Sequence, residues 1–214
     1  MRLGRQGILP PASHHSEFPC IWSFPPRAIE IVEQTKLLLA AGGYHGFSYA
    51  DVSERVHIGK ASIHHHFPTK AELVLAVVAR HRAQAREGLA GLDRHVEDPL
   101  ARLTAYTEYW AQCIREGSLP MCICAMLAAE LPMIPPEIAD EVRAYFGELS
   151  GWLASVLEKG VATGHFRLRD GVQAEAQAFM STVHGAMLTA RAVGDPDAFA
   201  SVTRAAIRQL TAPA

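Results

Sequence analysis

Residues 47–73 read FSYADVSERVHIGKASIHHHFPTKAEL, and this stretch decides the fold. Two short amphipathic segments, residues 50–56 and 60–67, flank a tight connection at residues 57–59, which is the spacing of a helix-turn-helix. The apolar side chains of both segments are spaced so that each helix buries one side against the other. These side chains are Val52, Val56, Ile58, Ile63 and Phe67. The stretch therefore predicts two short helices packed together.

Polar pairs at two places predict where helices begin. Ser48 lies three residues before Asp51, and Thr69 lies three residues before Glu72. At this spacing a hydroxyl and a carboxylate can close a capping box, in which each accepts a hydrogen bond from a free N–H group at the start of a helix. We expect one helix to begin after Ser48 and another after Thr69.

The second segment of the motif leaves polar side chains facing outward once its apolar side is buried. They provide a cation, a small residue, a hydroxyl group and imidazoles, a combination that suits base edges and phosphates in the DNA major groove. They are Lys60, Ala61, Ser62, His64 and His65. The segment has the chemistry of a DNA-recognition helix.

The stretch resembles the DNA-binding motif of the tetracycline-repressor (TetR) family of bacterial transcriptional regulators. That motif has a Gly-Phe-Ser/Thr entry, a Lys-x-Ser/Thr-Leu/Ile-Tyr-x-His/Tyr-Phe recognition helix and a Lys-x-Glu-Leu exit. Its elements stand here as Gly46-Phe47-Ser48, then Lys60, Ser62-Ile63-His64 and His66-Phe67, then Lys70 and Glu72-Leu73. The resemblance covers about residues 27–73 and is specific there.

Two positions depart from the family pattern. His64 stands where the family usually has a Tyr that touches a phosphate, so either a neutral imidazole makes that contact or the contact is lost. His57 stands where the family mostly has Gly. Because His tolerates a positive φ less well than Gly, this turn is expected to be less relaxed.

We assign DNA contacts along the whole motif. Lys60 and Ser62 are expected to enter the groove, where base contacts set specificity, while phosphate contacts set the register. Tyr49 either contacts DNA or packs against Phe47. The phosphate contacts are assigned to Ser48, Thr69 and Lys70, and the predicted DNA-binding set is completed by Tyr49, Ala61, His64, His65 and His66.

The run of three imidazoles, His64, His65 and His66, could suggest a metal site. Successive side chains on a helix diverge by about 100°, and ligands that converge on one ion need an i, i+4 spacing. We therefore assign the run to DNA rather than to solvent or metal. We predict no metal site in the chain, and no cofactor.

Composition and charge favour a soluble regulator. Hydrophobic residues make up 49% of the 214 residues, but no unbroken apolar run reaches the roughly 18 residues of a membrane span. Residues 27–95 carry nine Lys/Arg against seven Asp/Glu, and residues 96–214 carry nine against fourteen. The positive part therefore contains the helix-turn-helix, as phosphate binding needs. Without a signal-peptide pattern, we expect a cytoplasmic protein with reduced cysteines and no membrane partner.

Helical patterns continue through the rest of the chain. They predict helices at about residues 27–41, 69–92, 98–115, 121–131, 137–159, 171–193 and 197–210, besides the two of the motif. The fold class is therefore all-α, with about nine helices. A three-helix DNA-binding domain is predicted for residues 27–73, and the resemblance implies that residues 74–214 form a helical ligand-binding and dimerisation domain. Residues 1–26, rich in Pro, Gly, Ser and His, are expected to be a disordered arm.

The last two helices have apolar stripes that could serve two purposes. The pattern alone allows them to close the core of one subunit or to pair with a second subunit. The family resemblance implies the second, a four-helix homodimer interface. Small residues would permit the close approach of helices there: Ala174, Ala176, Ala178, Gly185, Ala186 and Ala190.

The resemblance also implies a cavity for a small-molecule effector in the C-terminal domain. Apolar and aromatic residues at helical spacing are, taken singly, more often plain core. The set predicted to line the cavity is Tyr106, Trp110, Cys113, Met121, Cys122, Met126, Phe146, Trp152, His184 and Met187. His184 is the best polar candidate, although a hydrogen-bonded structural histidine fits the pattern as well.

The chain is predicted to be a DNA-binding transcriptional regulator and not an enzyme, because no nucleophile elbow, phosphate loop, HExxH or paired-carboxylate pattern is found. The resemblance implies a ligand-responsive repressor of a palindromic operator on double-stranded DNA. A thiol-based redox or electrophile sensor that uses Cys113, Cys122 or Cys124 is the alternative. On a helix, the CxC spacing of Cys122 and Cys124 would direct their sulfurs to diverging faces, which argues against that alternative.

Overall fold

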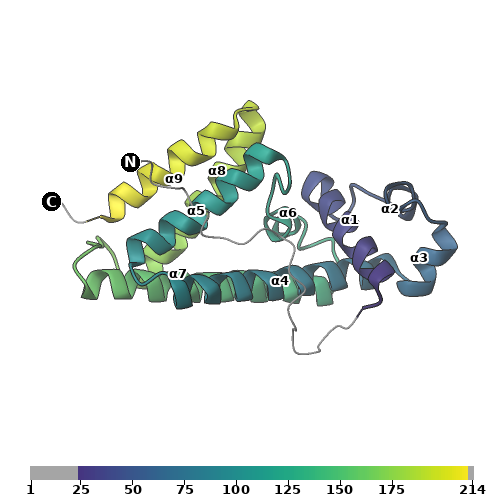
Figure 1. Ribbon diagram of the computed structural model, residues 1–214, viewed down its shortest axis with the longest axis horizontal. Coiled ribbons are helices and arrows are strands. Elements are labelled where there is room, and N and C mark those ends of the chain that lie inside the picture. Colours follow the sequence, from purple (N-terminus) through teal and green to yellow (C-terminus); the bar gives the residue numbers. More distant parts are fainter. Residues whose placement is uncertain (1–23, 212–214) are drawn as a thin grey trace, which may run out of the picture.

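The computed structural model describes residues 24–211 and confirms the all-α prediction (Figure 1). Within these residues the chain forms nine helices, and its only β-type pairing is an isolated bridge between Phe166 and Thr211. The helices are α1 (Pro26–Gly42), α2 (Tyr49–Val56), α3 (Lys60–His66), α4 (Lys70–His95), α5 (Pro99–Glu116), α6 (Ile123–Ala128), α7 (Pro136–Ala162), α8 (Val172–Val193) and α9 (Pro196–Leu210). Residues 1–23 of the predicted arm lie outside the described part, in which no helix is long and apolar enough to cross a membrane.

The predicted capping box forms in full at the start of α2 and by one of its two bonds at the start of α4. Ser48 and Asp51 close a complete capping box, with Ser48 N donating to Asp51 Oδ2 at 2.7 Å and Ala50 N donating to Ser48 Oγ at 3.2 Å. At α4 the Thr69 hydroxyl accepts from Glu72 N at 3.2 Å. These bonds satisfy N–H groups that a helix start leaves free.

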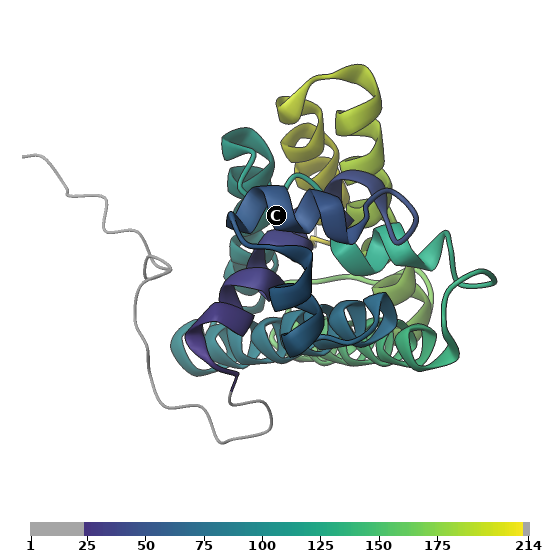
Figure 2. The same cartoon turned by 90° about the vertical axis from the view of Figure 1, so that its right-hand side faces the viewer.

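Helices α1, α2 and α3 pack together at one end of the molecule, which Figure 2 views end-on. Their fully buried side chains come from all three helices: Ile31 and Leu39, Val52, and Ile63. Between α2 and α3, His57 has a φ of 52°, and it is the only residue other than Gly with a positive φ in residues 24–211. The turn therefore uses the left-handed conformation that His tolerates less well than Gly.

The larger part of the molecule is built around α4 and α7, which run side by side in Figure 1. Helices α8 and α9 pack against each other, and they join α4 and α7 through the contacts of α7 with α8 and of α5 with α9. Buried residues such as Leu103, Leu153 and Phe199 fill the space between these helices. Because α4 begins at the helix-turn-helix and then crosses the larger part, one continuous helix connects the two.

The predicted helix at 121–131 is shorter in the structure. It spans Ile123–Ala128, and Cys122 is its N-cap residue with an extended backbone (φ −64°, ψ 121°). Pro132 limits how far the helix can extend, because a proline disfavours a helical backbone at the residue before it, here Leu131. The chain therefore turns after α6 instead of continuing as a helix.

Candidate functional site: a helix-turn-helix surface and an interior pocket

The α3 helix presents the polar face that its sequence predicts. Ile63 is fully buried beneath the helix. The exposed side chains on the other side are those of Lys60, Ala61, Ser62, His64 and His65, while His66 is half-buried. A cation at the first turn and imidazoles at the last therefore lie open to a partner.

The imidazole of His64 is oriented by its neighbours. Its Nδ1 lies 3.1 Å from the carbonyl oxygen of Pro68, and its ring contacts the Tyr49 ring with centroids 4.6 Å apart. Because a carbonyl oxygen only accepts hydrogen bonds, Nδ1 carries the proton in this contact. The Nε2 atom is then left for a second partner, either as an acceptor or, in the imidazolium, as a donor.

Tyr49 is tied to the end of α3. Its hydroxyl donates to the Phe67 carbonyl oxygen at 2.8 Å, and the side chain is half-buried. Burial, and to a lesser degree the charge of Glu72, raises the pKa of Tyr49 to about 12, so the hydroxyl keeps its proton and remains a donor. Tyr49 thus fixes the position of α3 relative to α2.

Lys70 is placed differently from Lys60. Its ammonium donates to the Phe47 carbonyl oxygen and lies over the rings of Tyr44 and Phe47, at 4.9 and 4.2 Å from the ring centroids. Burial lowers the pKa of Lys70. These inward contacts hold the entry of the motif together, and a phosphate contact would compete with them.

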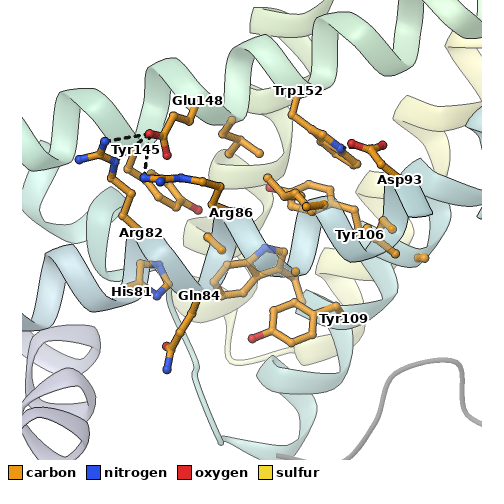
Figure 3. A pocket seen from close by; sticks show the side chains of 18 of the residues that line it. His81, Arg82, Gln84, Arg86, Asp93, Tyr106, Tyr109, Tyr145, Glu148 and Trp152 are labelled. Carbon is orange, nitrogen blue, oxygen red and sulfur yellow. Dashed lines mark hydrogen bonds and ion pairs between the residues drawn. The ribbon is translucent and has the colours of Figure 1, made fainter. Parts of the chain in front are cut away.

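A pocket of about 400 Å³ lies among α4, α5 and α7 in the larger part of the molecule (Figure 3). Five aromatic side chains are among the residues that line it, which suits a small molecule with a flat apolar body. The aromatic side chains are Tyr106, Tyr109, Trp110, Tyr145 and Trp152. Lys36 also lines it, although this residue belongs to α1 at the DNA-binding end. Its ammonium donates to Gln84 Oε1 at 3.3 Å.

Charged groups lie in the pocket wall. Glu148 accepts hydrogen bonds from Arg82 at 2.8 Å and from Arg86 at 3.2 Å, as the dashed lines in Figure 3 show. Asp93 accepts from Trp152 Nε1 at 3.2 Å. The Tyr106 hydroxyl is buried without a hydrogen-bond partner among residues 24–211. It is a group that a bound molecule could satisfy.

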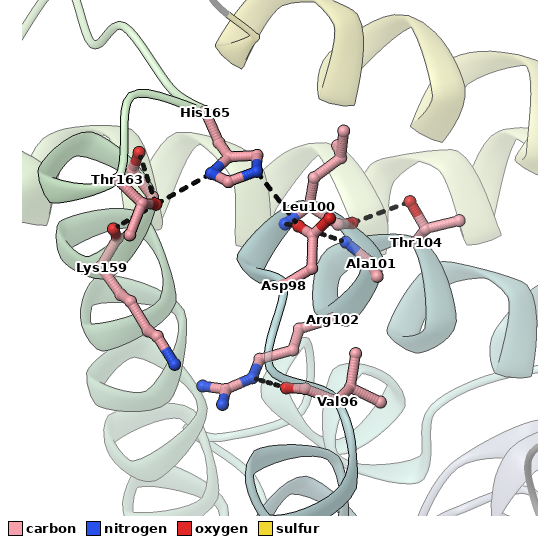
Figure 4. A network of polar contacts seen from close by, with 10 residues as sticks. Val96, Asp98, Leu100, Ala101, Arg102, Thr104, Lys159, Thr163 and His165 are labelled. Carbon is pink, nitrogen blue, oxygen red and sulfur yellow. Dashed lines mark hydrogen bonds and ion pairs between the residues drawn. The ribbon is translucent and has the colours of Figure 1, made fainter.

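A polar network fixes the connection between α4 and α5 beside the pocket (Figure 4). Arg102 donates to the Val96 carbonyl oxygen at 2.5 Å and pairs with Asp93 at 2.9 Å. Asp98 caps α5 by accepting from Leu100 N at 2.7 Å. Since Asp93 also binds Trp152, the network ties the connection to the pocket wall.

Only part of the predicted effector-binding set lines this pocket. Tyr106, Trp110 and Trp152 do so. The others lie elsewhere: Cys113, Met121, Cys122, Met126, Phe146, His184 and Met187. Met121, Cys122 and Met187 instead belong to the closely packed core, with at most 1% of their surface exposed.

The residues that sequence reasoning missed come mostly from α4. His81, Ala85 and Leu89 recur every four residues and line the pocket, with Gly88 beside them. Two small residues on one face of a long helix leave room that larger side chains would fill. This spacing was the available signal, although packing against α5 and α7 is needed to turn such room into a cavity.

The two sulfurs of the CxC sequence converge, so the prediction that they diverge is wrong. Cys122 is the N-cap residue of α6 and is not within the helix, so the helical angle between successive side chains does not apply to it. The ligand atoms of His81, Cys122 and Cys124 all lie within 4.8 Å of one another, and all three residues are buried. Cys113 is half-buried and outside this group.

The surroundings of Cys122 favour its thiolate. Burial raises the pKa of the Cys122 thiol, but interactions with Cys124, His184 and His81 outweigh burial and hold the pKa well below its ordinary value. The Tyr145 hydroxyl lies 3.6 Å from the Cys122 sulfur. Burial and the neighbouring Cys122 raise the pKa of Cys124.

Two side chains of the larger part hold the end of α1 and the turn after it. Glu130, which follows α6, accepts hydrogen bonds from Tyr44 N and His45 N. Arg191 of α8 donates to the carbonyl oxygens of Ala40 at 3.3 Å and Ala41 at 2.6 Å. Both side chains bind backbone groups, so they fix the position of the α1 end itself.

Two sequence-family models together match most of the described chain. A model of the bacterial regulatory proteins of the tetR family matches residues 31–77, and a model of the tetracyclin repressor-like C-terminal domain matches residues 99–206. No curated protein sequence gives a significant match.

Solved structures show the same fold. The chain is similar to a transcriptional regulator of the TetR family from Agrobacterium tumefaciens, with 47% identity, a TM-score of 0.85 and coverage of 87% of this chain and 98% of the other. The regulatory protein TetR from Rhodobacter sphaeroides has 22% identity, a TM-score of 0.78 and coverage of 86% and 98%. The reduced form of NemR from E. coli has 17% identity, a TM-score of 0.74 and coverage of 88% and 99%.

Proposed function

The chain belongs to the TetR family of transcriptional regulators, and from this premise we propose that it is a ligand-responsive repressor. In this proposal it binds a palindromic operator as a homodimer and releases it when a small molecule occupies the pocket among α4, α5 and α7. One observation carries the proposal. The pocket is lined both by Lys36 of α1 and by the middle of α4, so its occupant would touch one helix of the DNA-binding end and the helix that connects this end to the larger part.

We assign DNA contacts chiefly to the exposed face of α3. Lys60, Ala61 and Ser62 would meet base edges at its first turn, and the imidazoles at its end would meet phosphates. Ser48 and Thr69 lie exposed at the starts of α2 and α4, where helix N-termini favour a phosphate. Tyr49 and Lys70 would support this face through their internal hydrogen bonds.

The dimer is assigned to α8 and α9. Of the predicted small residues, Ala174, Ala178 and Gly185 are exposed on α8, whereas Ala176, Ala186 and Ala190 are buried within the subunit. Leu188 of α8 is 54% exposed and Val202 of α9 is 37% exposed, so both helices present a large apolar side chain to solvent. A second copy packed here would cover them and present two α3 helices to successive major grooves, about 34–36 Å apart.

Release from DNA would follow from differential binding. A molecule that fits the pocket best when α4 is tilted shifts the population toward that state by the difference between its affinities for the two states. The tilt reaches α1 through Lys36 and Gln84 and through the pairing of Arg80 with Glu33 at 2.8 Å. The spacing of the two α3 helices then no longer matches the operator.

The pocket favours an aromatic effector with a hydrogen-bonding group. Its aromatic side chains suit a flat ring system, and the free hydroxyl of Tyr106 suits a polar atom on that ring. Thiol sensing has less support as the main function, because Cys122 and Cys124 are fully buried from reagents in solution.

The proposal is tested by footprinting the protein on the DNA upstream of its own gene and screening aromatic compounds for loss of the footprint. An active compound should raise the melting temperature of the protein without DNA and quench Trp110 and Trp152 fluorescence. Tyr106→Phe should weaken its effect, whereas Tyr44→Phe, outside the pocket, should not. If no compound that binds this pocket changes DNA affinity, the proposal is wrong.

A further inference from the structure

A group of sulfur and imidazole donors lies next to the pocket, which one of its members, His81, also lines. The ligand atoms of His81, Cys122 and Cys124 are within 4.8 Å of one another. His184 of α8 lies near Cys122, and its Nε2 is buried without a hydrogen-bond partner among the described residues. His81 Nε2 is likewise buried without a hydrogen-bond partner among the described residues. A buried polar atom without a partner is costly, so a group that binds both nitrogens would stabilise the fold.

We propose that His81, Cys122, Cys124 and His184 form a binding site for a thiophilic metal ion, either Zn²⁺ or Cu⁺. Two cysteine sulfurs and two imidazole nitrogens are a ligand set that such ions prefer over Mg²⁺ or Ca²⁺. This site is separate from the proposed effector function, which does not require it.

The spacing of the donors fits one ion after a small contraction. With metal–sulfur bonds of about 2.3 Å and metal–nitrogen bonds of about 2.0 Å, two ligand atoms of a tetrahedral ion lie roughly 3.5 Å apart. The donor atoms of His81, Cys122 and Cys124 lie within 4.8 Å of one another, so small side-chain movements would bring these three to that separation, and His184 would complete the set by moving toward them from α8. Cys122 contributes because it is the N-cap residue of α6, from which its sulfur reaches Cys124.

The orientation of His184 also fits a metal ligand. Its Nδ1 lies 2.9 Å from the Met180 carbonyl oxygen, which only accepts, so Nδ1 is the protonated nitrogen. The lone pair is then on Nε2, the atom without a partner. A backbone carbonyl that fixes the tautomer and ring direction of a ligating histidine is the usual arrangement around protein metals.

The donors come from separate elements. His81 is on α4, Cys122 and Cys124 are at the start of α6, and His184 is on α8. An ion would therefore join α4 directly to α6 and α8. The two residues that hold the end of α1 belong to the same region: Glu130 comes just after α6, and Arg191 lies on α8.

Cobalt substitution tests the site in the full chain. The protein is purified with a reductant and a chelator, and both reagents are removed before the titration. Titration with Co²⁺ should reach one ion per chain and give intense visible bands of tetrahedral cobalt together with a near-ultraviolet thiolate-to-cobalt band. Zn²⁺ should displace Co²⁺ and bleach both. Cys122→Ser and Cys124→Ser should each halve the thiolate band and weaken binding at least tenfold, and His184→Asn should shift the visible bands.

Cys113→Ser is the matched control, because this thiol lies outside the group, and His65→Ala controls for the exposed imidazoles of α3. Both should leave the spectrum unchanged. A spectrum without a thiolate band, or one lost equally in Cys113→Ser, would overturn the proposal.

A second measurement needs no variant. Alkylation followed by mass spectrometry should show that Zn²⁺ slows the modification of Cys122 and Cys124 at least tenfold in partly denaturing urea, and leaves Cys113 unaffected. Equal rates with and without the ion would contradict the site. Competition against chelators of known affinity for Zn²⁺ and for Cu⁺ then decides which ion is bound more tightly; failure of both to bind overturns the proposal.

Discussion

Glu130 Oε2 lies 2.6 Å from the backbone nitrogen of Tyr44, so a carboxylate from the larger part of the molecule accepts a hydrogen bond from the turn that follows α1. The same carboxylate accepts from His45 N at 3.3 Å. Sequence patterns assign Glu130 no role, since a single carboxylate after an apolar helix has no local partner. The structure places it at the junction of the DNA-binding end with the rest of the molecule.

Replacing this carboxylate should loosen the turn. A hydrogen bond to a charged group contributes about 1.5–3 kcal/mol, so Glu130→Ala should speed amide exchange at Tyr44 and His45 by roughly tenfold or more. Hydrogen–deuterium exchange followed by NMR or mass spectrometry measures this. Glu108→Ala, an exposed carboxylate on α5, is the control. Unchanged exchange in Glu130→Ala would show that the contact does not hold the turn.

Gly43 should resist substitution for two reasons. Its backbone (φ 72°, ψ −166°) lies in a region that only Gly adopts readily, and a Cβ there would stand 2.5 Å from Glu130 Oε2. Gly43→Ala should cost about 1–3 kcal/mol of unfolding free energy, read from urea titration. Gly59→Ala, where a Cβ meets open space, should cost much less. Similar losses in the two variants would contradict the explanation.

Lys60 should contribute to operator binding without a role in assembly. Lys60→Ala is expected to weaken operator affinity by about 1–3 kcal/mol and, if it meets a phosphate, to lower the salt slope by about one. Sedimentation should find the oligomeric state unchanged. Lys159→Ala, an exposed cation on α7, should leave affinity unaffected. Operator binding like that of the parent would count against α3 as the recognition helix.

The imidazoles of α3 predict a pH-dependent affinity. Imidazole side chains gain positive charge as pH falls through about 6.5, and positive charge strengthens phosphate contacts. We expect affinity to rise from about pH 8 to about pH 6 at constant salt, measured by fluorescence anisotropy. A His64→Gln/His65→Gln/His66→Gln variant should lose most of this rise, whereas His165→Gln should keep it. If the DNA affinity of the parent protein does not change between these pH values, the prediction is wrong.

The capping box at α2 should make the DNA-binding end sensitive to acid. Hydrogen bonds from the Ser48 side chain and backbone lower the pKa of Asp51 below its ordinary value. A group whose folded pKa is lowered contributes stability above its unfolded pKa, and this contribution is lost as pH falls through the folded one. Ser48→Ala should cost about 1 kcal/mol near neutral pH and less at low pH. Unfolding followed by circular dichroism measures this loss of stability. A loss of equal size at every pH would show that the Asp51 carboxylate does not contribute to it.

The local parts of this protein were predictable from sequence, and the reason is visible at particular residues. The helix-turn-helix depends on contacts between near neighbours, such as Ser48 with Asp51 and Ile63 beneath α3. Patterns of three or four residues report such contacts directly. The exposed face of α3 could therefore be assigned residue by residue.

The pocket could not be predicted in the same way. Lys36, Tyr106 and Trp152 are far apart in the chain and meet only because α1, α5 and α7 pack around α4. Periodicity shows that an aromatic side chain is buried, but not whether it faces a neighbour or a void. The convergence of Cys122 and Cys124 was missed for a different reason: prediction placed Cys122 inside the helix that it caps.

The unbroken course of α4 has a geometric consequence. Its 26 residues span about 39 Å at 1.5 Å per residue. If the helix behaves as a stiff beam pivoting near its far end, a rotation of about 5° moves the end that begins at Lys70 by roughly 3 Å. A small displacement of α4 at the pocket would thus produce a larger displacement at its Lys70 end, next to the helix-turn-helix.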